Sequence, residues 1–214
     1  MTSTEALIRD LSADLPPVKR RDVRREAGAL LALGATELAL ILMTHGMRPD
    51  MGRVIVSPFM AWKIGCLAVL AGVGCTAAIR SFAPMTRPRR GLALTLGLAG
   101  LAIVSGAFVT PAADSSRALI DRLAPGSGMV CALAIVVLAL PIMALMAVLM
   151  RRAAPVQPKR SALTAGLAAS LCGALIFTAC CPMNDPLYIV VWYSAGIGAV
   201  TAADRWLLPR RFRL

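Results

Sequence analysis

Six long apolar runs dominate this sequence and restrict what the chain can fold into. A helix that crosses the hydrocarbon core of a bilayer needs roughly 20 consecutive apolar residues. Six segments approach or reach that length, near Ala27–Thr44, Phe59–Ile79, Gly91–Thr110, Met129–Met150, Ala162–Cys180 and Leu187–Ala203. Because lipid offers the backbone no hydrogen bonds, each run must satisfy its own N–H and C=O groups as a helix. We therefore predict an all-α fold, a polytopic membrane bundle with six transmembrane helices.

The composition favours a membrane protein over a soluble domain. Apolar residues make up 58% of the 214 residues, whereas soluble domains contain about 45–50%. The net charge of +12 is compatible with nucleic-acid binding, but Lys and Arg gather in short clusters between the apolar runs. Such clusters are typical of loops that flank membrane spans, and no DNA-binding or RNA-binding motif accompanies them. We expect contact with membrane lipid and no direct contact with nucleic acid.

The distribution of Lys and Arg predicts the orientation in the membrane. Eighteen of the 23 lie in the tails and connections on one side of the runs, and five lie on the other side. Loops rich in Lys and Arg stay in the cytoplasm. We therefore expect an inner-membrane protein with cytoplasmic N- and C-termini. It divides into a cytoplasmic N-terminal tail (1–26), a six-helix membrane domain (27–208) and a basic cytoplasmic C-terminal tail (209–214).

The pattern of apolar residues predicts a short amphipathic helix in the N-terminal tail. One helical stripe is formed by Leu7, Ile8, Leu11 and Leu15, and Pro16–Pro17 ends the helix. A helix of this length is marginal alone in water. It would gain order by binding in a groove of a partner protein. It would also gain order on the inner leaflet, beside the basic segment Lys19–Arg25. The pattern does not distinguish these alternatives.

No catalytic motif is visible, and we expect no enzymatic activity. The sequence has one His and lacks a nucleophile elbow, a zinc-protease motif and a phosphate-binding loop. Glu37 lies deep in the first run and Lys63 just inside the second. Polar groups inside membrane spans often mark function. Glu37 is expected to pair with Lys63, to reach a wet crevice, or to be a packed, hydrogen-bonded or protonated carboxyl.

The six cysteines separate by their predicted depth. Three lie within spans and are interpreted as packing residues: Cys66, Cys75 and Cys172. The other three, Cys131, Cys180 and Cys181, lie at the outer face, where disulfides are favoured. Cys131 and one of the adjacent pair are expected to meet there, as a bridge, a soft-metal site or inert thiols. Candidate further ligands on the same side are His45, Asp50, Met183 and Asp185.

Several short motifs, taken in order, resemble one known family. Met47-Arg48-Pro49-Asp50 follows the first run, and Cys131, Leu140-Pro141 and Arg151–Pro155 mark the fourth. The most specific stretch is Cys181-Pro182-Met183-Asn184-Asp185-Pro186, which continues through Val191-Trp192-Tyr193 to Gly196-Ile197. Together they are similar to the NrsF family of negative regulators of sigma F, which are six-span membrane anti-sigma factors of proteobacteria.

The resemblance implies a function and assigns roles to residues. Such proteins hold an extracytoplasmic-function sigma factor inactive at the bacterial inner membrane and respond to heavy-metal or oxidative stress. The family's paired outer cysteines correspond to Cys131 and Cys181, and the N-terminal tail would bind the sigma factor. Cys180 stands where the family often has His, so the identity of any third ligand is left open. No resident cofactor is implied, only a transient metal ion at Cys131 and Cys181.

A small inner-membrane transporter or metal-efflux protein is the alternative function. Glu37, Lys63 and the outer thiols motivate it, because transporters place polar groups within their spans. Inverted or parallel repeats are typical of such proteins. We find no convincing repeat between the two halves of this chain.

Overall fold

A computed structural model of the protein describes residues 4–13, 22–83, 88–109, 122–153 and 155–210. These residues form helices and no strand, which confirms the predicted all-α fold. The helices are α1 (Thr4–Ala13), α2 (Val23–Thr44), α3 (Met51–Val54), α4 (Pro58–Ser81), α5 (Pro88–Val109), α7 (Pro125–Ala153), α8 (Pro158–Phe177) and α9 (Pro186–Arg210).

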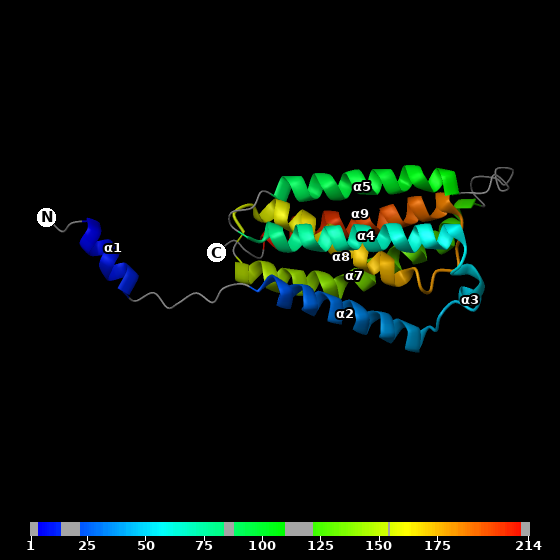
Figure 1. Ribbon diagram of the computed structural model, residues 1–214, viewed down its shortest axis with the longest axis horizontal. Coiled ribbons are helices and arrows are strands. Elements are labelled where there is room, and N and C mark those ends of the chain that lie inside the picture. Colours follow the sequence, from blue (N-terminus) through cyan, green and yellow to red (C-terminus); the bar gives the residue numbers. More distant parts are fainter. Residues whose placement is uncertain (1–3, 14–21, 84–87, 110–121, 154, 211–214) are drawn as a thin grey trace.

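The long helices run side by side with alternating direction and form an elongated bundle (Figure 1). The connection from α8 to α9 and the connection from α2 to α4 lie at one end, which we call the thiol end. The connection from α7 to α8, the start of α2 and the last turn of α9 lie at the opposite end, which we call the basic end. Figure 1 therefore places both termini of the bundle at the basic end.

Helix α8 forms the centre of the bundle and packs against α4, α7 and α9. Thirteen of its 20 residues are buried, and most of these are Ala, Gly, Ser or Thr. Small residues let helix backbones approach closely, which is how helices gain packing energy where lipid supplies no hydrophobic drive. At Gly173 an added Cβ would lie 3.0 Å from the backbone N of Ala139 and the backbone O of Ile135 in α7. Any larger residue at this position would therefore press on the α7 backbone and require it to move by a few tenths of an ångström.

Helix α2 lies at the edge of the bundle. Only Leu30 and Glu37 are buried among its 22 residues, and it contacts α7, α4 and α8. It begins at Val23 instead of the predicted Ala27, because the Asp22 side chain caps it by accepting hydrogen bonds from the backbone N–H groups of Arg24 (3.0 Å) and Arg25 (3.4 Å). The peripheral packing makes α2 the long helix most easily shifted against the rest.

Five of the helices are long and apolar enough to cross a membrane, namely α2, α4, α7, α8 and the Pro186–Leu208 part of α9. These helices agree with a membrane protein. The predicted span Gly91–Thr110 coincides with α5, which is not among the five. Helix α5 begins with the charged pair Arg89–Arg90 and ends beside residues 110–121, which lie outside the described residues. The count of six spans is not confirmed and stays a prediction.

The predicted amphipathic helix of the tail is present as α1, and its apolar side chains are exposed. Leu7 and Ile8 are each 60% exposed, and Leu11 is 65% exposed. Leu15, the fourth residue of the predicted stripe, lies outside the described residues. At the other terminus α9 continues to Arg210, past the predicted domain end at residue 208.

Replacing Gly173 by Val tests the close contact between α7 and α8. The added side chain would overpack the interface, and we expect a loss of stability of about 1–3 kcal/mol. Thermal unfolding of the purified protein in detergent measures it. The matched control is Gly65→Val, because a Cβ added at exposed Gly65 meets nothing within 4 Å. Equal unfolding temperatures for the two variants would contradict the packing argument.

Candidate functional site

Cys131 and Cys181 lie together in a buried cluster at the thiol end. Cys131 is on α7 and Cys181 is in the connection between α8 and α9, and their exposed fractions are 6% and 0%. The two thiols interact directly. The Cys131 Sγ also lies 3.0 Å from the Tyr188 Oη. All six cysteines of the chain are free. The structure thus brings the two predicted sensing residues into contact.

Lys63 supplies a positive charge beside this pair. Its side chain is 1% exposed, and its Nζ lies 5.0 Å from the centre of the Tyr193 ring. The hydrogen bond from Cys131, and after it the charge of Lys63, lower the pKa of the Cys181 thiol below its ordinary value, although burial opposes the shift. The thiolate is the form of cysteine that reacts with oxidants and binds soft metals. The lowered pKa therefore favours the thiolate form of Cys181.

Arg48 holds the connection that carries Cys181. Its guanidinium Nη1 donates to the Cys181 backbone oxygen at 3.1 Å and to the Asn184 Oδ1 at 3.0 Å. Its Nε and Nη2 each lie 2.7 Å from a carboxylate oxygen of Asp50. This ion pair holds the pKa of the Asp50 carboxyl below its ordinary value. Because Arg48 follows α2 in the chain, it fastens the end of α2 to the thiol site.

The adjacent thiol of Cys180 points elsewhere. Its Sγ donates to the Gly46 backbone oxygen at 3.5 Å, so it contacts the turn after α2 and not Cys131. Burial raises the pKa of the Cys180 thiol, which keeps it protonated and less reactive. The structure thus selects Cys181 from the adjacent pair, a choice that the sequence pattern alone left open.

Asp185 organises the start of α9. Its Oδ1 accepts a hydrogen bond from the Leu187 backbone N–H at 2.8 Å, as an N-cap residue does. Its Oδ2 also lies 2.9 Å from the Arg122 Nε. Burial raises the pKa of the Asp185 carboxyl, but the hydrogen bonds from Arg122 and Leu187 outweigh it, so the pKa lies below its ordinary value of 3.8. The carboxylate therefore ties α9 to the segment before α7.

Trp192 completes the connection between α9 and α7. Its Nε1 donates to the Leu123 backbone oxygen at 2.8 Å. The indole lies directly on Gly128, where a Cβ would fall 1.9 Å from the indole Cε2. Gly128 is about one helical turn before Cys131, so this contact positions the part of α7 that carries the thiol.

The candidate further ligands do not complete a metal site in the described part of the chain. His45 is exposed at the C-terminal end of α2, and Met183 packs half-buried against the thiol cluster. Asp50 and Asp185 are each bound to an arginine. Among the described residues, no three His, Cys, Asp or Glu side chains are grouped so that they could hold a metal ion.

Other polar residues lie away from the thiol pair. Glu37 is buried in α2, and its carboxylate has no hydrogen-bond partner among the described residues, so it does not pair with Lys63. Asp204 on α9 is fully buried against Gly166 and was missed by the sequence analysis, because it follows directly after the predicted end of the last run at Ala203. A slightly longer hydropathy window would have included it.

A second thiol contact lies between α4 and α8, where the Sγ atoms of Cys75 and Cys172 are 3.5 Å apart. Both side chains are partly buried among apolar residues of the bundle. Buried cysteines in apolar surroundings are generally inert. This contact agrees with the packing role predicted for these two residues.

Comparison with known proteins gives consistent matches over nearly the whole chain. The family described as negative regulator of sigma F matches residues 11–214. The "Anti-sigma-F factor NrsF" of Caulobacter vibrioides is 28% identical over 208 residues, which cover 95% of this chain and 96% of that protein. The "Probable anti-sigma-F factor NrsF" of Azospira oryzae is 26% identical over 198 residues, which cover 91% of each chain. No solved structure matches the chain.

Two substitutions separate the roles of Asp185 in capping and in ion pairing. Asn retains the ability to cap, so Asp185→Asn should lose the ion pair alone, whereas Asp185→Ala should lose a further ~0.5–2 kcal/mol. Because the pKa of Asp185 is lowered by folding, its contribution is present at neutral pH and is lost as the pH falls through the folded-state value. Thermal unfolding at pH 7 and pH 3 measures this, and the wild type should lose more stability on acidification than Asp185→Asn. Identical acid sensitivity would contradict the assignment.

Proposed function

Because the chain belongs to the NrsF family of negative regulators of sigma F, we propose that it is a membrane-bound anti-sigma factor that sequesters an extracytoplasmic-function sigma factor and releases it on heavy-metal or oxidative stress. The observation that carries the sensing part of this proposal is the buried contact between the thiols of Cys131 and Cys181. Membership of the NrsF family supports the proposed role as an anti-sigma factor. The apolar helices support a location in the bacterial inner membrane.

The bundle's two ends suit a topology with cytoplasmic termini. The basic end carries the start of α2, the connection from α7 to α8 and the last turn of α9. Among the described residues of the bundle, eleven Lys and Arg lie at this end, at the starts of α2, α5 and α8, the ends of α4 and α7 and the last two turns of α9, and four lie towards the thiol end, namely Arg48, Arg53, Lys63 and Arg122. By the positive-inside rule the basic end faces the cytoplasm and the thiol end faces outward. In this orientation α5 serves as the remaining span of a six-helix membrane domain, and stress reaches the thiols without crossing the bilayer.

The exposed stripe of α1 is the proposed binding element for the sigma factor. An amphipathic helix binds a partner by placing its apolar side chains in a hydrophobic groove. Leu7, Ile8 and Leu11 are all at least 60% exposed, so they are available for such a groove. Leu15, outside the described residues, extends the stripe in the sequence. The tail thus combines an unpartnered apolar face with direct attachment to α2.

Sensing acts through the pair of thiols. An oxidant takes two electrons from Cys131 and Cys181, two protons leave, and a disulfide joins α7 to the connection before α9. Alternatively the two thiolates bind a soft metal ion transiently. Either change alters the position of α7, and α7 contacts α2, which leads into the tail. Release needs two arrangements of the bundle that the two states of the thiols favour differently.

Substituting Leu11 tests the tail. Leu11→Glu places a charge in the apolar stripe, and we expect it to lose most of the sigma factor that co-purifies with the wild-type protein. Desolvating an unpaired carboxylate in an apolar groove costs several kcal/mol. The matched control is Ala13→Glu, which adds the same charge in the last turn but on the opposite side of α1. Full retention of the sigma factor by Leu11→Glu would show that α1 is not the main docking element.

Substituting the thiols tests the sensor. In cells, Cys131→Ser and Cys181→Ser should each abolish induction of the sigma-dependent genes by cadmium or hydrogen peroxide, because one remaining thiol cannot form the bridge. Cys66→Ser is the control, since Cys66 lies on α4 apart from the pair. A reporter gene measures induction. Normal induction in both variants would refute the sensing role while leaving the anti-sigma role intact.

A further inference from the structure

Two thiols in the middle of the bundle lie in contact and have no part in the proposed sensing function. Cys75 on α4 and Cys172 on α8 have their Sγ atoms 3.5 Å apart. The helix backbones come close beside them, because a Cβ added at Gly74 would lie 3.4 Å from the Ala168 Cα. The sulfur atoms of a disulfide are about 2.05 Å apart, so the two thiols need to approach by only about 1.5 Å.

This contact is more open than the one at the thiol end of the bundle. Cys75 and Cys172 are both half-buried, whereas Cys131 and Cys181 are buried. Each of the two central thiols is at least five residues, or about 7.5 Å, from either end of its helix. Both helices are long and apolar enough to cross a membrane. A reagent therefore reaches this pair from the side of the helices and not from their ends.

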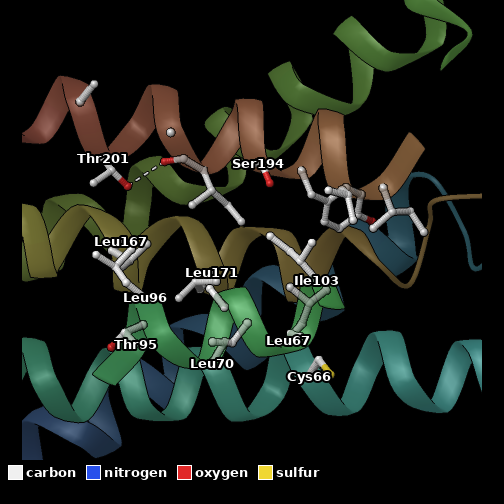
Figure 2. Close-up of a pocket in the computed structure, with 18 of the residues that line it drawn as sticks. Cys66, Leu67, Leu70, Thr95, Leu96, Ile103, Leu167, Leu171, Ser194 and Thr201 are labelled. Atoms are coloured by element: carbon white, nitrogen blue, oxygen red, sulfur yellow. Dashed lines mark hydrogen bonds between the residues drawn. The ribbon is translucent and has the colours of Figure 1, made fainter. Parts of the chain in front are cut away.

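The surroundings of the pair are apolar. Figure 2 shows Leu70 of α4 with Leu167 and Leu171 of α8, which line a groove of about 710 Å³ on the side of the bundle. Cys172 packs against the cluster that these three leucines form. A lipid hydroperoxide carries a two-electron oxidant into such surroundings. Hydrogen peroxide must leave water to enter them, at a cost for each of its hydroxyl groups.

A buried carboxyl lies within electrostatic range of the pair. Glu37 on α2 is 8% exposed, and neither of its carboxyl oxygens has a hydrogen-bond partner among the described residues. Its neighbours Leu33 and Leu38 pack against the same core cluster as both thiols. Cys75 and Glu37 are the titratable groups that act on Cys172. Three groups that the proposed function does not use therefore gather between α2, α4 and α8.

Such a carboxyl can relay a proton without becoming charged. A thiol in apolar surroundings is generally inert because it stays protonated. If one oxygen of Glu37 accepts the thiol proton while the other donates its own proton to the leaving group, no ion forms where an unpaired ion is most costly. The carboxyl thus removes the obstacle that makes a thiol inert at this place.

We propose that Cys75 and Cys172 form a second reactive site, which reduces the hydroperoxide of a lipid acyl chain and becomes a disulfide. The Cys172 sulfur attacks the terminal oxygen of the hydroperoxide, the O–O bond breaks, and the lipid leaves as an alcohol with the proton that Glu37 relays. The sulfenic acid on Cys172 then reacts with the Cys75 thiol, which forms the S–S bond and releases water. Two electrons pass from the two sulfurs to the peroxide. The site goes beyond the proposed sensing function and uses neither of the sensing thiols.

The choice of oxidant is tested on the full-length protein in phosphatidylcholine nanodiscs. Linoleic acid hydroperoxide and an equal concentration of hydrogen peroxide are compared, and mass spectrometry of peptides locates each disulfide. We expect the Cys75–Cys172 disulfide to form at least tenfold faster with the lipid hydroperoxide, with one hydroxylinoleic acid per disulfide. Absence of this disulfide with both oxidants would overturn the site. Equal rates would overturn the choice of a lipid-borne oxidant.

Two variants separate the roles of the two thiols. After treatment with linoleic acid hydroperoxide, Cys75→Ser should carry a sulfenic acid on Cys172 that dimedone traps, whereas Cys172→Ser should leave Cys75 unmodified. The matched control is Cys66→Ser, which removes a half-buried thiol from the same helix as Cys75 and should form the disulfide at the wild-type rate. A trapped sulfenic acid on Cys75 would overturn the assignment of Cys172 as the attacking thiol.

The relay is tested with Glu37→Gln, which keeps the size of the side chain and removes the acidic proton. General acid–base catalysis contributes roughly 10²–10⁴-fold, so we expect disulfide formation by linoleic acid hydroperoxide to slow at least tenfold. Copper phenanthroline, which oxidises neighbouring thiols without this relay, should give the wild-type yield of the same disulfide. An unchanged rate with the hydroperoxide would overturn the relay. Equal losses with both oxidants would assign Glu37 a packing role and overturn it as well.

Discussion

The close packing of α8 is the constraint on which the rest of this structure depends. Its buried face consists largely of small residues, and at Gly173 the backbone of α7 comes so near that an added Cβ would lie 3.0 Å from it. Lipid provides no hydrophobic drive between helices, so van der Waals contact at such short range supplies the packing energy. With α8 held at the centre, the connection after it carries Cys181 to the start of α7, where Cys131 lies.

The thiol end is held by charged groups that act on short connections between helices. Arg48 binds the Cys181 connection, and Asp185 both caps α9 and binds Arg122. These contacts surround the thiol pair and leave its two sulfur atoms facing each other and Lys63. A disulfide formed between Cys131 and Cys181, as proposed, would therefore act on helix ends that these hydrogen bonds and ion pairs hold in place. The least tightly packed long helix, α2, is the one that continues into the tail, which is the arrangement that the proposed release of the tail requires.

Much of this arrangement was readable from the pattern of residues, and particular failures are instructive. The apolar runs, the tail helix and the location of Cys131 and Cys181 at the same end of the bundle followed from hydropathy, periodicity and charge. Asp204 was missed because a run was taken to end at Ala203, and the suggested pair of Glu37 with Lys63 is absent from the described contacts. The first failure concerns where an apolar run ends. The absent pair concerns which side of a helix faces which neighbour, and apolar periodicity is weak where helices are apolar on every side.

By itself the sequence determined the class of fold, the direction of the charge asymmetry and the set of candidate thiols, because bilayer thickness and backbone hydrogen bonding leave few choices for long apolar runs. Only the tertiary structure decided that Cys181 and not Cys180 meets Cys131, and that Arg48 anchors the α8–α9 connection that carries Cys181. These are contacts between residues 50 to 136 positions apart in the chain. They depend on how small residues let the helices approach and rotate against one another, which no local pattern records.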